Sequence, residues 1–147
     1  MRLTARVLPE WVDHYGHMNL AYYLVAFDRA TDTLWPTIGL GAGLRAQGLG
    51  TFAAETWVGY QREVTEGMDL TFSSEVLGFD DKRLLVRHLM FHAGEGWLAA
   101  ENEVLFLCVD LVARKVGRWP EATLAAFALA PQGAPAKRLA LRRSPAG

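Results

Sequence analysis

The residues best suited to do chemistry lie in one short segment, Asp13-His14-Tyr15-Gly16-His17-Met18-Asn19. Asp13 follows a strand-like stretch and precedes a helical pattern, so its carboxylate is expected near the free N–H groups and positive end of that helix. A carbonyl held between the two would meet an oxyanion donor on one side and an ionised base or nucleophile on the other, which is the minimum for acyl transfer. Gly16 would let backbone and ligand approach closely.

The same segment has plainer explanations. An aspartate ahead of a glycine and a helix is commonly a turn or capping residue, and Asn19 is well suited to cap the helix. His17 could orient Asp13 or contact a substrate, or it could be an ordinary loop histidine. His88 and His92 would share one face of a strand, but they have no convincing carboxylate or cysteine companion, so the sequence predicts no metal site.

One long helix must follow this segment. From Leu20 to Trp35 apolar residues recur at spacings of three and four, which predicts an amphipathic helix. Asn19 marks its start and Pro36 its end. The glycines at 39, 41 and 43 follow a helix rather than a strand, so we expect a flexible lid or linker there rather than a nucleotide loop.

Strands are predicted on both sides of this helix. Arg2 to Val12 alternates apolar and polar residues and is broken at Pro9. Four longer strands are predicted at 51–65, 68–78, 83–92 and 97–109, with a further short strand near Val116 and a short helix over 120–128. The joints at 66–67, 79–82 and 94–96 are short, so we expect successive strands to pair antiparallel.

This order of elements predicts an α+β domain over residues 1–129, in which a long antiparallel sheet covers the helix. Residues 130–147 are rich in Ala, Pro and Arg without periodicity, and we expect a largely mobile tail. A small sheet also presents a second face and an edge, which pairing with a second copy would hide. We therefore expect a homodimer or a homotetramer.

Composition narrows the class of partner. The 147-residue chain has a formal net charge of −1, which argues against nucleic acid. It is 51% hydrophobic but has no apolar run long enough to span a membrane, and its first residues lack the pattern of a secretory signal. We expect a cytoplasmic protein with a small-molecule partner. The single cysteine, Cys108, is read as core filler.

Asp13-x-x-Gly16-His17-Met18-Asn19, with Tyr23 after it, resembles the signature of thioesterases of the 4-hydroxybenzoyl-CoA type, although Met18 stands where Val is usual. The resemblance covers roughly residues 1–118. It implies a hotdog fold, in which a long antiparallel sheet wraps one central helix, with an active site at a dimer interface. It also implies that the Asp13 carboxylate is catalytic and that the backbone N–H of Leu20 or a neighbour polarises the thioester carbonyl. Gly16, Asn19 and Tyr23 would then lie at the substrate site.

A narrower resemblance rests on Pro9-Glu10-Trp11-Val12-Asp13, on Phe27 to Asp32 and on Asp81-Lys82-Arg83-Leu84. These stretches are similar to the thioesterase that accompanies, or is fused to, L-carnitine dehydrogenase and hydrolyses betainyl-CoA. A quaternary ammonium is held by aromatic faces, each contact contributing about 0.5 to 2 kcal/mol. The candidates for such a cage are Trp11, Trp57, Tyr22 and Tyr60, although aromatic residues on strands are most often core.

Charged residues extend this expected site. Glu55 alternates with Trp57 on a strand and could supply a second carboxylate or a partner for a cation, although a solvated strand face explains it as well. Coenzyme A carries phosphates, for which the candidate contacts are Arg62, Lys82, Arg83 and Arg87. Scattered surface charge explains these four equally well.

The sequence therefore predicts hydrolysis of an acyl-CoA thioester to the free acid and coenzyme A, without a metal or redox cofactor. Two other functions stay open. An enoyl-CoA hydratase on the same fold would need Asp13 and His17 as an acid/base pair, and their spacing is one residue short. A non-catalytic acyl-CoA-binding sensor would normally carry an appended module, for which we see no room.

Overall fold

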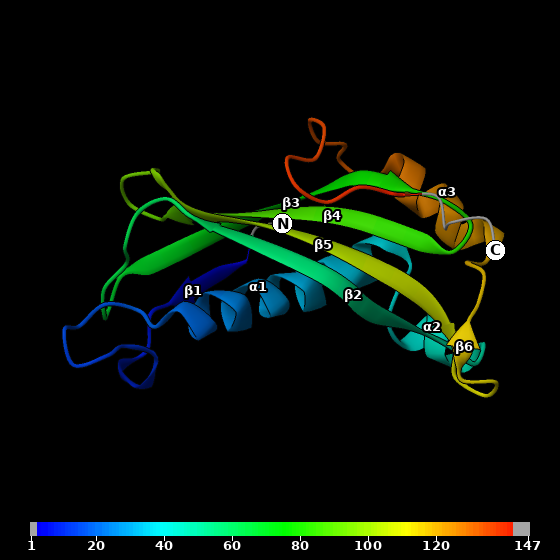
Figure 1. Cartoon of the computed structure of the whole chain (residues 1–147), viewed down its shortest axis with the longest axis horizontal. Helices are drawn as coiled ribbons and strands as arrows, with labels where there is room; N and C mark the ends of the chain where they lie inside the picture. The colour runs from blue at the N-terminus through cyan, green and yellow to red at the C-terminus, as the bar shows by residue number, and fades with distance from the viewer. Residues whose placement is uncertain (1–2, 143–147) are drawn as a thin grey trace. The chain divides into compact units, whose positions relative to one another are not determined.

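The computed structural model describes residues 3–142 (Figure 1). The first half of the chain contains β1 (Thr4–Arg6), the 3-10 turn η1 (Pro9–Trp11), α1 (Leu20–Leu34), η2 (Trp35–Ile38) and α2 (Ala42–Ala46). The second half contains β2 (Leu49–Tyr60), β3 (Asp69–Phe79), β4 (Arg83–His92), β5 (Leu98–Asp110), β6 (Lys115–Val116) and α3 (Glu121–Leu129). The expected α+β layout, with one long helix among long strands, is confirmed.

The strands form one sheet in the order β1-β3-β4-β5-β2, and β6 pairs with β5. β1 runs antiparallel to β3, with Ala5 opposite Leu70. Short turns join β3 to β4 and β4 to β5, so these neighbours also run antiparallel, as expected from the sequence. The first strand is shorter than predicted, because Pro9 begins the 3-10 turn that ends at Trp11.

The expected hairpin at Glu66-Gly67 is wrong. β2 pairs with β5 at one edge of the sheet, whereas β3 lies between β1 and β4, so the link between β2 and β3 is a crossover. Its residues are held by the segment that carries Asp13: the Met18 N–H donates to the Val64 carbonyl, and His17 forms a bridge with Thr65. The backbone groups of residues 61–68 therefore bond to a segment distant in the sequence. In a hairpin they would have bonded to the neighbouring strand.

Two compact units share the four long strands. Unit 1 comprises the described residues up to Leu34 together with Val58–Ser74 and His88–Asn102, and unit 2 comprises the remainder. In unit 1, α1 buries the face that carries Tyr23, Phe27 and Ala30, as its apolar spacing predicts. The Phe27 ring meets Phe72 of β3 edge to face, with centroids 5.9 Å apart. This packing fixes the middle of α1 against the sheet.

Unit 2 has its own apolar core, built around Phe127 of α3, whose ring contacts Phe79 and Trp119. Pro120 caps α3 from outside rather than occupying its first turn. A short helix, α2, forms within the glycine-rich stretch that was expected to be a loop, with Gly43 inside it. Leu44 of this helix is buried, which explains why a tertiary contact rather than local propensity forms it.

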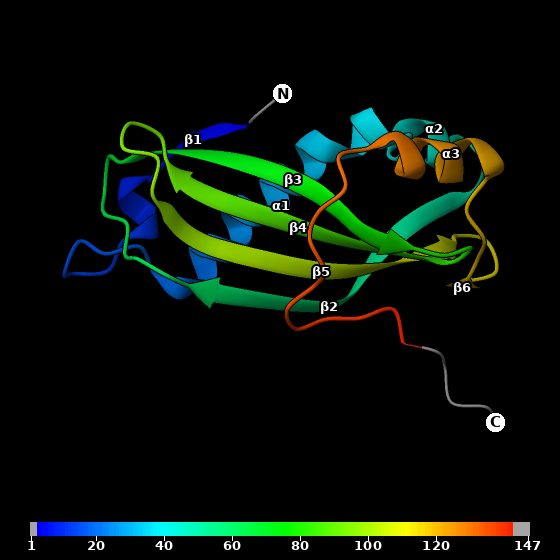
Figure 2. The ribbon, with the colours of Figure 1, turned by 90° about the horizontal axis from the view of Figure 1, so that it is seen from above.

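After α3 the chain continues as a strap, which we define as residues 131–142. Figure 2 shows it crossing the strands of unit 2. Gln132 bridges Val76 of β3, Arg87 of β4 donates to the carbonyls of Ala134 and Pro135, and Glu103 of β5 accepts from the N–H groups of Lys137, Arg138 and Leu139. The expectation of a mobile tail missed these contacts; its last residues, 143–147, lie outside the described part of the chain.

Candidate functional site

The Asp13 loop is a tight reversal held by its own backbone. Asp13 N–H donates to the His17 carbonyl, and Gly16 N–H donates to the Asp13 carbonyl, both at 3.0 Å. Gly16 has a φ of 82°, in the left-handed region that favours glycine. This conformation closes the loop between Val12 and Met18, which form an isolated bridge.

The Asp13 carboxylate is anchored through one oxygen. Its Oδ1 accepts hydrogen bonds from the N–H groups of Tyr15 at 2.9 Å and His17 at 3.3 Å. Its Oδ2 accepts none from residues 3–142, and the residue is exposed. An oriented carboxylate with one oxygen open to solvent can act as a base toward water or as a nucleophile.

The start of α1 lies directly after this loop. Asn19 caps the helix, because its side-chain Oδ1 accepts from the Ala21 N–H at 3.0 Å, which confirms the predicted cap. Leu20 is the first helical residue, so its N–H has no acceptor within the helix, and it donates to nothing else in the described chain. The Leu20 N–H is therefore a free donor at the positive end of the helix.

A pocket of about 270 Å³ opens beside this helix start, and we call it the helix-start pocket. Its lining residues are Met18, Leu20, Tyr23, Tyr60, Gln61, Arg62 and Glu63. The Tyr60 hydroxyl donates to the Leu20 carbonyl at 3.3 Å, and its ring meets Tyr23 edge to face with centroids 5.0 Å apart. The Tyr23 hydroxyl accepts from the Val64 N–H at 3.3 Å. Both rings are thus fixed in orientation.

His17 does not pair with the Asp13 side chain. Its Nε2 lies 3.4 Å from Glu63 Oε2, and only its backbone N–H reaches Asp13. His17 thus contacts Asp13 through its main chain alone, and its imidazole lies against Glu63. Glu63 itself was not singled out in the sequence, because some fifty residues separate it from the Asp13 segment.

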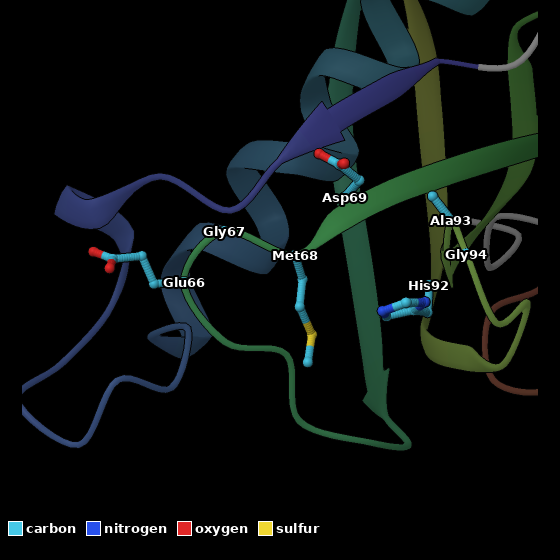
Figure 3. A pocket seen from close by; sticks show the side chains of 7 residues that line it. All are labelled: Glu66, Gly67, Met68, Asp69, His92, Ala93 and Gly94. Carbon is cyan, nitrogen blue, oxygen red and sulfur yellow. The ribbon is translucent and has the colours of Figure 1, made fainter.

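A second hollow, of about 660 Å³, lies between the start of β3 and the end of β4 (Figure 3). Figure 3 shows the Asp69 carboxylate directed toward β1, where Arg6 binds it at 2.9 Å. The ring of His92 stacks on Trp97, and its Nδ1 accepts the Glu95 N–H at 2.9 Å. These two titratable groups are engaged. Glu66 also lines the hollow and is exposed, but none of the lining residues begins a helix, so this carboxylate has no free helix N–H beside it.

Neither a metal-binding cluster nor a membrane-spanning helix is present among residues 3–142. No group of three or more His, Cys, Asp or Glu side chains there could hold a metal ion. Nor is any helix within that range long and apolar enough to cross a membrane.

Residues 7–127 match the Thioesterase-like superfamily. The chain belongs to this family. It is 41% identical over 106 residues to a betainyl-CoA thioesterase of Pseudomonas aeruginosa, a match that covers 71% of this chain and 67% of that protein. It is 38% identical over 123 residues to an L-carnitine dehydrogenase/betainyl-CoA thioesterase of Agrobacterium fabrum, covering 84% of this chain but only 25% of that longer protein.

Solved structures agree with the family. A putative thioesterase of Pseudomonas putida is 31% identical and superposes with a TM-score of 0.78, over 98% of this chain and 96% of that one. A hypothetical protein of Staphylococcus aureus, solved in complex with CoA, has the fold at a TM-score of 0.83 and 23% identity, over 93% and 89% of the two chains. The hotdog fold expected for a member of this thioesterase family is confirmed.

The aromatic residues expected to form a cage are not all part of the helix-start pocket. Trp11 is buried in the core of unit 1, stacked on Tyr22 at 5.9 Å and covered by the Arg29 guanidinium at 4.9 Å. Trp57 lies in unit 2, where the Arg138 guanidinium lies 5.8 Å from its ring. Of the four candidates, Tyr60 alone lines the helix-start pocket. Its aromatic companion there is Tyr23.

The charged candidates are also divided. Arg87 is buried and bound to Glu103 and to the strap, so it cannot reach a phosphate, and this expectation is wrong. Arg83 forms an ion pair with Asp80 at 2.7 Å. Lys82 and Glu55 are exposed residues of unit 2. Arg62 lines the helix-start pocket, and its guanidinium lies 4.1 Å from the ring of Trp97. Arg62 is therefore the phosphate candidate that stays at the site.

Proposed function

We propose that this chain hydrolyses an acyl-CoA thioester to the free acid and coenzyme A, with Asp13 as the catalytic carboxylate. The observation that carries the proposal is the Asp13 carboxylate, anchored through Oδ1 and open at Oδ2, in the loop that leads to the unpaired N–H of Leu20. Membership of the thioesterase family supports it.

The chemistry follows from these two groups. As a base, Asp13 takes a proton from water while the water oxygen bonds to the thioester carbon, and the Leu20 N–H holds the developing oxyanion. Collapse breaks the C–S bond, and the thiolate leaves with a proton returned by Asp13. As a nucleophile, Asp13 would form a mixed anhydride and release the thiolate before water completes the hydrolysis. Neither route needs a metal or redox cofactor, and none is part of this proposal.

Betainyl-CoA is the substrate we favour, because relatives at 41% and 38% identity are named for it. The hydratase alternative loses support, because the His17 imidazole pairs with Glu63 rather than with Asp13. The sensor alternative would keep the fold and the pocket without turnover.

A homodimer with a cytoplasmic location completes the proposal. β2 is an edge strand, and its residues from Phe52 to Thr56 are exposed on both faces. An exposed edge is a template for pairing with another strand, and a second copy would cover it. A dimer of such dimers would give the homotetramer.

The deciding experiment measures coenzyme A release from betainyl-CoA, acetyl-CoA, a medium-chain and an aromatic acyl-CoA. Asp13→Asn should lower kcat by about 10²- to 10⁴-fold with an unchanged melting temperature, because the amide can neither take a proton nor attack. Glu10→Gln, an exposed carboxylate before the loop, serves as the control. Full activity of Asp13→Asn would contradict the mechanism, and binding without turnover by the wild type would favour the sensor.

A further inference from the structure

Glu63 is a carboxylate that the proposed hydrolysis does not use. It lines the helix-start pocket together with Tyr23 and Tyr60, and its side chain is 73% exposed. Its one ion-pair partner in the described chain is His17, at 3.4 Å, which carries charge only when protonated. Among residues 3–142, Glu63 is the one acidic side chain that lines this pocket. The neighbouring Arg62 also lines it, with its guanidinium 4.1 Å from the Trp97 ring.

The aromatic surfaces beside Glu63 suit a cation. Tyr60 is half exposed, and its hydroxyl is tied to the Leu20 carbonyl, so its ring cannot swing away from the pocket without losing a hydrogen bond. Burial raises the pKa of Tyr23, and the Glu63 carboxylate raises it further, which indicates that the charge of Glu63 is felt at this ring. Aromatic faces attract a quaternary ammonium through cation–π contacts, and a neighbouring carboxylate adds a charge of the opposite sign.

We infer that Glu63, with the ring of Tyr60, is the specificity-determining pair of this site and selects an acyl group that carries a quaternary ammonium. The inference rests on the proposed function. It identifies Glu63 and Tyr60 as the residues that distinguish a positively charged acyl group from a neutral one. It replaces the cage expected from the sequence, of which Trp11 is buried and Trp57 belongs to the other unit.

The pocket position agrees with this role. Leu20 lines the same pocket and carries the N–H assigned to the thioester carbonyl. Betaine places its trimethylammonium one methylene from its carbonyl, so the cation must bind close to the oxyanion donor. The Glu63 carboxylate and the Tyr60 ring line the same pocket as Leu20 and so meet this requirement.

The test uses a matched pair of substrates, betainyl-CoA and 3,3-dimethylbutanoyl-CoA, in which a carbon replaces the ammonium nitrogen with the same shape. The ratio of their kcat/KM values measures selection for charge alone. Glu63→Gln should lower this ratio by about fivefold, as expected for an exposed charge pair. Glu66→Gln, an exposed carboxylate three residues later, should keep the wild-type ratio.

The role of Tyr60 is tested with the same ratio of kcat/KM values. Tyr60→Phe keeps the aromatic face and should keep most of the ratio, whereas Tyr60→Leu should lower it by about threefold or more. An unchanged ratio in both Glu63→Gln and Tyr60→Leu, with folded proteins by melting curve, would overturn the inference.

A binding measurement shows whether Glu63 selects the cation even if the protein does not hydrolyse the substrate. The two substrates are replaced by thioether analogues of coenzyme A that end in a trimethylammonium or a tert-butyl group and cannot be hydrolysed. Calorimetry then gives the ratio of the two Kd values for the wild type and Glu63→Gln. A ratio of Kd values that differs between the wild type and Glu63→Gln supports the inference even without turnover. The same ratio in both proteins contradicts it.

Discussion

At the scale of single residues, the free N–H of Leu20 can be tested without disturbing the helix. Leu20 is the first residue of α1, where proline is well tolerated because its missing N–H would have had no partner inside the helix. Leu20→Pro should therefore lower kcat by about 10²- to 10³-fold, the usual cost of losing one oxyanion donor, with little change in melting temperature.

Leu20→Ala provides the matched control, since it removes the side chain and keeps the N–H. A kcat close to that of the wild type in Leu20→Ala, together with a large loss in Leu20→Pro, assigns the effect to the backbone donor. Equal losses in both variants would show that the side chain of Leu20 matters and the N–H does not.

His88 is a buried histidine whose titration should control stability at acid pH. Its Nε2 lies 2.8 Å from Thr31 Oγ1 and its Nδ1 lies 2.7 Å from Ser74 Oγ, and its ring is fully buried against Phe27. Burial lowers the pKa of His88 from its ordinary 6.5 to about 4. The unfolded chain therefore takes up this proton more readily than the folded one.

The folded state keeps the full contribution of neutral His88 above about pH 6.5 and loses it as the pH falls toward 4, by about 3 kcal/mol. Denaturant unfolding of the wild type and of His88→Gln across this range should show a smaller loss of unfolding free energy for the variant. His14→Gln, an exposed histidine, should keep the slope of the wild type. Identical slopes in all three proteins would contradict the prediction.

At the scale of elements, the strap is held by a buried ion pair. Arg87 and Glu103 meet at 3.3 Å with side chains 6% and 0% exposed. Burial by itself raises the pKa of Glu103, but hydrogen bonds from the N–H groups of Leu139, Lys137 and Arg138 and from Arg87 hold it below its ordinary value. Glu103 thus joins β5 to β4 and to the strap.

Glu103→Gln should destabilise the protein by up to about 3 kcal/mol, because the buried Arg87 loses its fully buried partner and keeps only Glu75, at 3.8 Å. Hydrogen exchange of the amides at 137–139 should become faster in this variant. The double variant Arg87→Met with Glu103→Leu should be less destabilised than Glu103→Gln alone, since no charge is left buried. If exchange at 137–139 is fast already in the wild type, the strap is the mobile tail that the sequence indicated.

At the scale of the whole molecule, the exposed edge strand predicts how copies assemble. Ala54 of β2 is exposed and Leu129 of α3 is 87% exposed. Ala54→Lys should shift the proposed dimer toward monomer, because lysines from the two copies would meet when two β2 edges pair. Leu129→Lys should not. Sedimentation at micromolar concentration measures the outcome, and a dimer that persists in Ala54→Lys would place the interface elsewhere.

The sequence alone determined the local features of this protein. The spacing of apolar residues gave α1, Asn19 caps it as predicted, and the motif around Asp13 identified the family. The limits of β4 agree with the prediction to the residue. These features depend on neighbouring residues, so periodicity and capping chemistry are enough to find them.

The tertiary structure decided what depends on residues far apart in the chain. The link at Glu66-Gly67 is a crossover and not the expected hairpin, because β2 pairs with β5 and not with β3. In the folded chain Arg87 is buried beside Glu103, and Glu63 lies at the start of α1. Trp11, which was expected at the substrate site, is part of the core. Strand pairing and side-chain burial are set by contacts between distant segments, and no pattern within a single segment records which of them will meet.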